Sequence, residues 1–192
     1  MADNRAIGVF DSGLGGLTVV SELLRYLPEE SIVYFGDTGR VPYGTRSRET
    51  IKRYASEDEA FLLKNNVKLI IAACGTVSSV ASEDASKLPV PYFEVVSHAA
   101  YSAAKETKNG NIGVLGTAAT VNSAKHEKYI KEVLPKARVT ACASSMLECG
   151  KILCKTFAFI ALNMRLCISL VFLVFSNGKQ MKTNFYPKHH SL

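Results

Sequence analysis

The sequence predicts an α/β protein in which helices flank a parallel β-sheet. Short apolar segments alternate with segments of helical length from residue 6 to residue 141. Glycine, serine or threonine follows most of the apolar segments, as is typical where a buried strand ends in a turn. The chain has 192 residues, 47% of them hydrophobic, which is enough for a substantial core. Strands that alternate with helices form right-handed crossovers, and such crossovers join parallel strands.

Six short segments are predicted strands because each is apolar and lies between turn-forming residues. They are residues 6–10, 31–35, 67–73, 91–95, 111–115 and 137–141. Five of the segments between them have the length and polarity of helices. They are residues 17–27, 47–65, 77–88, 97–107 and 120–133. Ser47 is expected to cap the second helix. One face of the first helix is expected to carry its large apolar residues, which are Leu17, Val20, Leu23, Leu24 and Leu27.

Residues 1–148 are expected to form the α/β domain, and residues 149–192 an atypical tail that is not a domain. Residues 152–175 are almost wholly apolar and do not continue the strand–helix alternation. The apolar run 166–175 is too short to span a bilayer, and the longer window 157–175 has Arg165 near its centre, which is costly in lipid. We therefore do not expect a membrane span. Residues 176–192 are polar and basic, a composition typical of disorder.

The net charge of +6 also comes from this tail. All 17 acidic residues lie at or before Glu148, where lysine and arginine balance them, and the excess of positive charge follows. The first 148 residues therefore give no electrostatic reason to expect a nucleic acid partner. The five cysteines form no Cys-x-x-Cys pair and no metal-ligand spacing. Their odd number, with no apolar signal segment near Met1, predicts reduced thiols in a cytoplasmic protein.

Cys74 is the first candidate for chemistry, because it follows the predicted strand 67–73 and precedes a predicted helix. Ligands of parallel α/β sheets bind beyond the carboxyl ends of the strands. A helix amino terminus favours a thiolate over a thiol, so we expect the pKa of Cys74 to lie below the ordinary value of about 8.5. The alternative interpretation is a buried structural cysteine that acts as a small hydrophobic residue.

Other polar or glycine residues also follow predicted strands. They are Asp11 and Ser12, the loop residues Pro42, Tyr43 and Gly44, the pair Gly75 and Thr76 after Cys74, and Thr117 with Thr120. If the strands form one parallel sheet, all these residues lie along the same edge. Hydroxyl and backbone N–H groups there could hold a carboxylate and Asp11 an ammonium, so the edge suits a small zwitterion. The alternative is that Asp11 and the threonines only cap helices and the glycines only form turns.

The glycine-rich turn after the first strand does not predict a nucleotide site. Gly13-Leu14-Gly15-Gly16-Leu17-Thr18 has threonine where the dinucleotide pattern needs its third glycine. No Gly-Lys-Ser or Gly-Lys-Thr follows, so the turn is not a P-loop either.

Four motifs occur in a fixed order between residues 6 and 142. They are Ile7-Gly8-Val9-Phe10-Asp11-Ser12-Gly13-Leu14-Gly15-Gly16-Leu17-Thr18-Val19, Tyr34-Phe35-Gly36-Asp37-Thr38 with Val41-Pro42-Tyr43-Gly44, Ala73-Cys74-Gly75-Thr76, and Gly116-Thr117-Ala118-Ala119-Thr120-Val121. Together they resemble the motifs of glutamate racemase, of the cofactor-independent aspartate/glutamate racemase superfamily. The resemblance implies the first of two pseudo-symmetric α/β domains and a reaction without pyridoxal phosphate or metal.

The resemblance also implies a mechanism for interconverting L- and D-glutamate, which provides D-glutamate for peptidoglycan. Two cysteines, one on each face of the substrate Cα, exchange the roles of thiolate base and thiol acid. Cys74 would be one of them, and Asp11 and Ser12 would contact the amino group and assist it. Pro42, Tyr43 and Gly44 would shape the pocket. The carboxylates would bind to Gly75, Thr76, Thr117 and Thr120.

The sequence departs from the family pattern after about Ala143. The second catalytic cysteine of the family lies in a Gly-Cys-Thr-His-Tyr-Pro type motif, and neither Cys154 nor Cys167 is followed by such a histidine. Cys142 lies in Ala-Cys-Ala-Ser, where the family usually has Ala-Cys-Pro, and is not the second catalytic cysteine. Because the resemblance and the composition change at the same place, we predict a frameshift, a read-through or an erroneous gene model there.

The missing motif predicts that this chain racemises glutamate negligibly, because one face of Cα would lack a proton donor. Two alternatives stay open: an aspartate or related amino-acid racemase, and a non-catalytic remnant that only binds a small molecule. An apolar surface is expected where a second domain would pack, so we also expect self-association, for which a homodimer is the simplest form.

Overall fold

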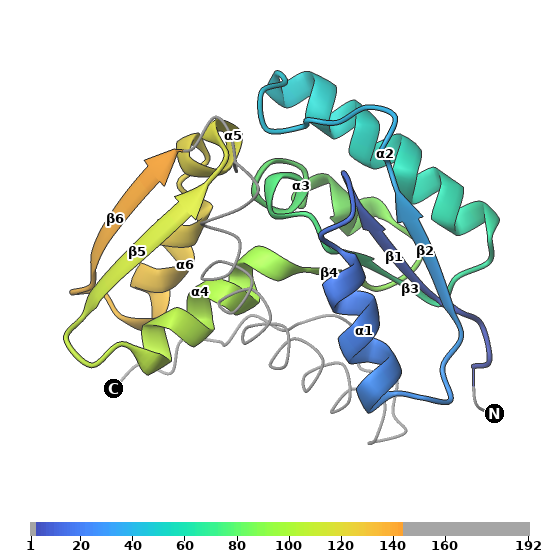
Figure 1. Ribbon diagram of the computed structural model, residues 1–192, viewed down its shortest axis with the longest axis horizontal. Coiled ribbons are helices and arrows are strands. Elements are labelled where there is room, and N and C mark those ends of the chain that lie inside the picture. Colours follow the sequence, from blue (N-terminus) through green and yellow to red (C-terminus); the bar gives the residue numbers. More distant parts are fainter. Residues whose placement is uncertain (1–2, 144–192) are drawn as a thin grey trace.

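The structure is a computed structural model that describes residues 3–143, and these residues form two α/β units side by side (Figure 1). The first unit has a four-stranded sheet in the order β2-β1-β3-β4, and the second has the two-stranded sheet β5-β6. The strands are β1 (Ile7–Asp11), β2 (Ile32–Gly36), β3 (Leu69–Ala72), β4 (Tyr92–Glu94), β5 (Asn111–Gly116) and β6 (Arg138–Ala143). All pair in parallel, which confirms the predicted fold class and the six predicted strands.

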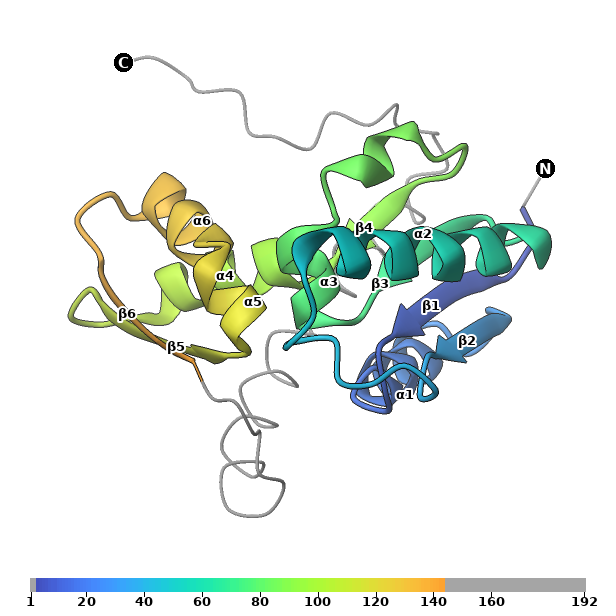
Figure 2. The ribbon, with the colours of Figure 1, turned by 90° about the horizontal axis from the view of Figure 1, so that it is seen from above.

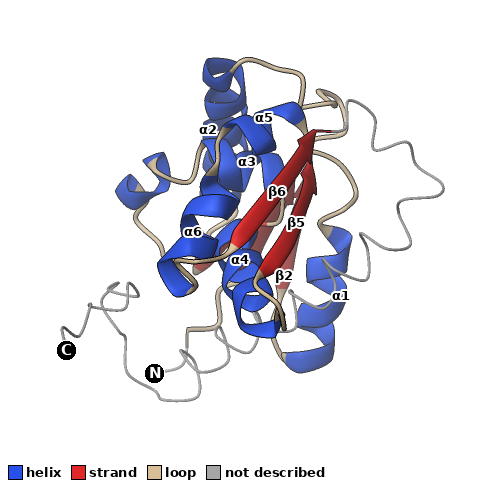
Figure 3. Cartoon of the chain, turned by 90° about the vertical axis from the view of Figure 1, so that its left-hand side faces the viewer, coloured by secondary structure: helices blue, strands red, loops and turns tan. Residues whose placement is uncertain are grey.

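The expectation of one continuous sheet is wrong, because β5 does not pair with any strand of the first sheet. Burial explains the separation. All five residues of β1 are buried, as a central strand covered on both faces requires, whereas exposed residues alternate along β5 with residues that are buried or of intermediate exposure. Figure 3 shows β5 and β6 with helices α4 (Val95–Glu106) and α6 (Lys125–Val133) on one side only. These helices and strands share a core that contains Val96, Ile112 and Ile130.

Helices cover both faces of the first sheet. Ile7 and Val9 of β1 pack with the buried residues of α1 (Leu17–Tyr26), whereas Phe10 points to the opposite face. That face is covered by α2 (Arg48–Lys64) and α3 (Gly75–Val80), and Figure 2 shows the sheet between α1 and α2. Each large side chain buried in this way contributes roughly 1.5–3 kcal/mol to folding. The carboxyl ends of β1 and β3 are thereby fixed side by side.

The predicted apolar face of the first helix is partly wrong. Val19 and Leu23 are buried on β1 and β3, but Leu17 and Leu24 are 46% and 53% exposed. The helix starts at Leu17, directly after Gly16. With this start, Val19 and Leu23 face the sheet together, because residues four apart lie on the same face of a helix. The predicted cap of α2 is confirmed, because the backbone N–H of Thr50 donates to the Ser47 hydroxyl at 3.2 Å.

Two predicted helices are divided. The predicted segment 77–88 overlaps α3, which begins earlier, at Gly75, and includes after a break a separate 3-10 turn at Asp84–Lys87. Serine hydroxyls in this segment bond to backbone carbonyls, as Ser82 does to the Ser78 carbonyl at 2.9 Å, and such bonds compete with helix formation. The predicted segment 120–133 overlaps α5 (Ala118–Asn122), which begins two residues earlier, and contains α6; the two helices are separated at Ala124, whose φ of 54° is left-handed.

Several predictions concern residues outside the described range of 3–143. These are the tail 149–192, its boundary at Glu148 and the apolar window 157–175. Between residues 3 and 143, none of the helices has the length and apolar character needed to cross a bilayer.

Candidate active site

The carboxyl ends of β1 and β3 bring Cys74 next to Ser12. The Cys74 thiol donates a hydrogen bond to the Ser12 hydroxyl, with 3.3 Å between sulfur and oxygen. The two residues are 62 positions apart in sequence, but β1 and β3 are hydrogen-bonded neighbours and each residue follows its strand. Cys74 is only 4% exposed and lies at the start of α3. The strand-end position predicted for Cys74 is therefore confirmed.

Asp11, at the end of β1, is buried, and its Oδ2 accepts a hydrogen bond from the Gly16 N–H at 2.9 Å. Gly16 is itself the N-cap residue of α1, and no side-chain hydrogen bond caps this helix, so the capping interpretation of Asp11 is wrong. A Cβ at Gly16 would lie 2.7 Å from Asp11 Cβ and 3.0 Å from Ala73 Cβ. Only glycine lets the turn approach the sheet this closely, and the turn holds the Asp11 carboxylate next to the cysteine.

The pKa of Cys74 is raised to about 11, which contradicts the predicted lowering. Burial is the main cause, and the negative charge of Asp11 adds to it. Hydrogen bonds from Ser12 and from the backbone at Ser12 and Val77 favour the thiolate but do not outweigh burial. The helix after Cys74 is also short, with six residues, so its dipole is weak. Cys74 is therefore a thiol at neutral pH.

Three threonine hydroxyls form a cluster where the two units meet. Thr76 Oγ1 lies 3.1 Å from Thr117 Oγ1, which lies 3.0 Å from Thr120 Oγ1. Thr117 also caps α5, because its hydroxyl accepts the Thr120 N–H at 3.2 Å, so the capping alternative is confirmed for Thr117. We call Thr76, Thr117 and Thr120 the threonine cluster. These residues follow strands of separate sheets, yet the fold brings them together as the sequence predicts.

The loop residues Pro42, Tyr43 and Gly44 lie in different environments. Pro42 is exposed and follows a cis peptide bond. Tyr43 is 2% exposed, and its hydroxyl bonds to carboxylates of the first unit rather than to the threonine cluster. Gly44 packs directly on Thr117, since a Cβ at Gly44 would lie 2.4 Å from Thr117 Cβ. Gly75 is exposed, with open space where a Cβ would be.

Tyr34 is a residue of this region that the sequence analysis missed. Its hydroxyl donates to the Gly13 carbonyl at 2.9 Å. The pKa of Tyr34 is raised to about 12, first by burial and then by the negative charges of Asp11 and Cys74, so its hydroxyl lies near both groups. Tyr34 belongs to a strand segment and looked like a core residue. One general rule could have identified Tyr34: the hydroxyl of a half-buried tyrosine usually forms a hydrogen bond.

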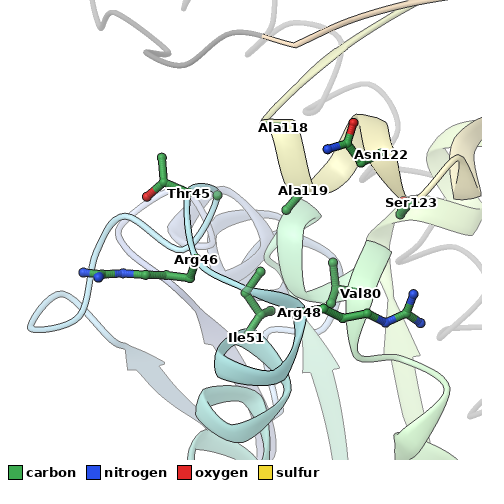
Figure 4. Close-up of a pocket in the computed structure, with 10 residues that line it drawn as sticks. Thr45, Arg46, Arg48, Ile51, Val80, Ala118, Ala119, Asn122 and Ser123 are labelled. Atoms are coloured by element: carbon green, nitrogen blue, oxygen red, sulfur yellow. The ribbon is translucent and has the colours of Figure 1, made fainter.

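Gly44 and Ala119 line a pocket of about 360 Å³, and Cys74 is not among its lining residues. Figure 4 shows Ile51 and Ala119 in its lining, with the side chains of Arg46 and Arg48 pointing in opposite directions. The two cations therefore do not converge on one anion. Among residues 3–143, no group of three or more His, Cys, Asp and Glu side chains is arranged to hold a metal ion.

Known proteins are similar to this chain in sequence and in fold. No family model matches the chain. The glutamate racemase of Geobacter metallireducens is 45% identical over 140 residues, which are 72% of this chain and 52% of that protein. The glutamate racemase of Enterococcus faecalis is 43% identical over 152 residues. The structure of glutamate racemase from Thermus thermophilus, in complex with β-chloro-D-alanine, superposes with a TM-score of 0.72 at 32% identity, and the match covers 91% of this chain and 82% of that one.

The chain belongs to the glutamate racemase family. A second glutamate racemase structure, from Francisella tularensis in complex with D-glutamate, superposes with a TM-score of 0.76 at 29% identity. The chain spans about half the length of the curated glutamate racemases that it matches. The strand-end cysteine, the buried acid Asp11 and the threonine cluster are thus the site candidates of a glutamate racemase family member.

Proposed function

We propose that residues 3–143 carry one half of a glutamate racemase site, in which Cys74 moves the proton on one face of the substrate Cα. The observation that carries this proposal is that Cys74 contacts Ser12 and is followed, two residues later, by Thr76 of the threonine cluster. The D-glutamate complex of the Francisella tularensis relative supports glutamate as the ligand. No cofactor takes part in the proposed reaction.

The polar groups near Cys74 suit the ammonium and the carboxylate of an amino acid. The buried Asp11 carboxylate would attract the substrate ammonium, while the hydroxyls of the threonine cluster would donate to a carboxylate. An ammonium next to Asp11 offsets the charge that raises the Cys74 pKa, so binding would favour the thiolate. The Ser12 hydroxyl, which accepts from the thiol, can rotate and donate to the thiolate.

Racemisation needs a second proton carrier on the opposite face of Cα. As a thiolate, Cys74 would accept the Cα proton of one enantiomer, and as a thiol it would donate a proton to the carbanion formed from the other. The family resemblance assigns the other face to a second cysteine, and the expected Gly-Cys-Thr-His-Tyr-Pro type motif does not occur in these 192 residues. We therefore propose glutamate binding and proton transfer at one face for this chain. The complete reaction would supply D-glutamate for peptidoglycan in the cytoplasm.

Alkylation of Cys74 tests the proposal. The protein is treated with iodoacetamide in the presence of L-glutamate, D-glutamate or L-aspartate, and modification of each cysteine is followed by peptide mass spectrometry. Cys142 is an internal control, because it is an exposed cysteine on β6. Both enantiomers of glutamate should slow the alkylation of Cys74 and leave that of Cys142 unchanged. Equal alkylation of Cys74 with and without glutamate would reject the proposal, and protection by aspartate alone would favour an aspartate racemase.

A further inference from the structure

A partly buried ionic network anchors the loop between β2 and α2. The Arg40 guanidinium is its centre: Nε donates to Asp37 at 2.5 Å, Nη2 donates to Asp58 at 2.7 Å, and Nη1 donates to Glu57. The guanidinium also lies over the Tyr54 ring, 4.3 Å from its centroid. Asp58 belongs to α2 and is completely buried, so the network joins the loop to a rigid element of the first unit.

Tyr43 connects this network to the candidate site. Its hydroxyl donates to Asp37 and lies 3.0 Å from Asp58 Oδ2, so it sits between two carboxylates that Arg40 also holds. The Tyr43 ring packs against Tyr54, with 5.2 Å between centroids. Because the Tyr43 side chain is held both at its hydroxyl and along its ring, the Tyr43 backbone has little freedom to move. The next residue in the chain is Gly44.

Gly44 connects the position of Tyr43 to the second unit through direct contacts. It is in van der Waals contact with Thr117, and its carbonyl accepts the Ala119 N–H at 3.4 Å. Thr117 is the middle residue of the threonine cluster, with hydroxyl contacts to both Thr76 and Thr120. A shift of Gly44 would therefore move the central hydroxyl of the cluster.

The composition of the network argues for a role beyond stability. Three carboxylates surround one guanidinium, and two of them, Asp37 and Asp58, are buried. Burying these charges costs desolvation free energy that an apolar replacement would avoid. Directional hydrogen bonds from a planar guanidinium fix geometry in a way that apolar packing does not.

We propose that Arg40 and Asp58 are positioning residues, which act through Tyr43 and Gly44 to hold Thr117 in place for binding a substrate carboxylate. The proposal rests on the proposed function in one respect only, namely that the threonine cluster binds glutamate. Neither Arg40 nor Asp58 would itself touch the substrate.

Amide hydrogen exchange in the free protein tests the positioning without any ligand. The variants are Arg40→Gln, Arg40→Lys, Asp58→Asn and the milder Tyr43→Phe, which keeps the ring and removes only the hydroxyl. Glu30→Gln is the matched control, because it removes another ion pair of the first unit, between Glu30 and Lys68. The Lys68 side chain is only 5% exposed, and Lys68 directly precedes β3. We expect Arg40→Gln and Asp58→Asn to raise the exchange rate of the Ala119 amide about tenfold relative to the control. Arg40→Lys should recover part of the protection, since a lysine keeps the charge but not the planar fork.

Glutamate protection of Cys74 gives the second measurement. In Arg40→Gln and Asp58→Asn, the glutamate concentration for half-maximal protection should rise about tenfold, while alkylation without glutamate keeps its rate. If the wild-type protein shows no protection, the proposed function fails and the exchange experiment still decides the positioning role. If the folded variants match the control in both measurements, Arg40 and Asp58 are only structural and the inference is overturned.

Discussion

The hydroxyl oxygens of Thr76 and Thr117 lie 3.1 Å apart, although the two residues follow strands of different sheets. This contact places the candidate carboxylate site at the junction of the two units rather than along one sheet edge. Thr76 and Thr120 are buried, and each finds a hydrogen-bond partner in Thr117. A ligand carboxylate that accepts from these hydroxyls would contact both units at once.

Replacing Thr76 with valine should weaken glutamate binding with little loss of the fold. Valine keeps the shape of threonine but removes one donor of the threonine cluster, so we expect about a tenfold higher Kd. Isothermal titration of glutamate into Thr76→Val measures the change. Thr140→Val, at an exposed position of β6, is the control and should bind as the wild type does. Equal affinity of all three proteins would remove Thr76 from the site.

The alkylation rate of Cys74 should rise with pH to a midpoint near 11, because burial and the Asp11 charge raise its pKa. Asp11→Asn removes the negative charge and keeps an oxygen that can accept from Gly16, so the midpoint should fall. Burial remains, and the midpoint should therefore stay above about 8.5. Rate measurements between pH 7 and 11.5 with peptide mass spectrometry provide the test. A higher midpoint in Asp11→Asn would contradict this electrostatic account.

Glu59 should reduce the stability of the protein at neutral and alkaline pH. It is 7% exposed, and burial, with smaller contributions from Asp58 and Asp84, raises its pKa to about 7. The folded state thus prefers the protonated acid. The stabilising contribution of the Glu59 proton is fully present below the unfolded pKa of about 4.3, and it is lost as the pH rises through about 7.

Glu59→Gln should therefore be more stable than the wild type at pH 8, on the order of 1–3 kcal/mol, and equally stable at pH 4. Urea unfolding at both pH values measures the difference. Glu29→Gln, at an exposed position after α1, should show no comparable pH dependence. A Glu59→Gln protein that is less stable at pH 8 would show that the carboxylate is favourably bound.

Gly16→Ala should destabilise the protein and disturb the hydrogen bond from the Gly16 N–H to the Asp11 carboxylate. The added methyl group would lie 2.7 Å from Asp11 Cβ and 3.0 Å from Ala73 Cβ, so the turn must move away from the sheet. We expect a loss of about 1–3 kcal/mol in the free energy of unfolding. Gly113→Ala is the matched control, since no atom lies within 4 Å of its Cβ position. Denaturant unfolding of both variants should separate them clearly, and equal stabilities would refute the close approach.

The purified chain should leave the optical rotation of L-glutamate unchanged in D2O, because the sequence contains no Gly-Cys-Thr-His-Tyr-Pro type motif for the second face of Cα. Mass spectrometry of the recovered glutamate measures deuterium at Cα in the same sample. Any exchange catalysed by Cys74 should remain in the L enantiomer and disappear in Cys74→Ser. Racemisation at an ordinary enzymatic rate would show that another group in this chain serves the second face.

Much of the candidate site was predictable because its residues stand at strand ends. A cysteine, an acid or a threonine directly after a short apolar segment is visible in the sequence, and parallel strands place such residues at one end of the fold. Asp11, Ser12 and Cys74 were found in this way, and the structure brings them together. Tyr34 was missed, because a tyrosine within a strand gives the same local pattern whether or not its hydroxyl is used.

The sequence by itself determined the parallel α/β class, the six strands and the family, since these depend on local periodicity and on ordered motifs. Only the tertiary structure decided that β5 and β6 form a separate sheet, that Tyr43 joins the Arg40 network, and that Cys74 is held as a thiol. Each of these depends on contacts between residues that are distant in sequence. Burial and the field of neighbouring charges act through space, so a linear pattern does not reveal their balance.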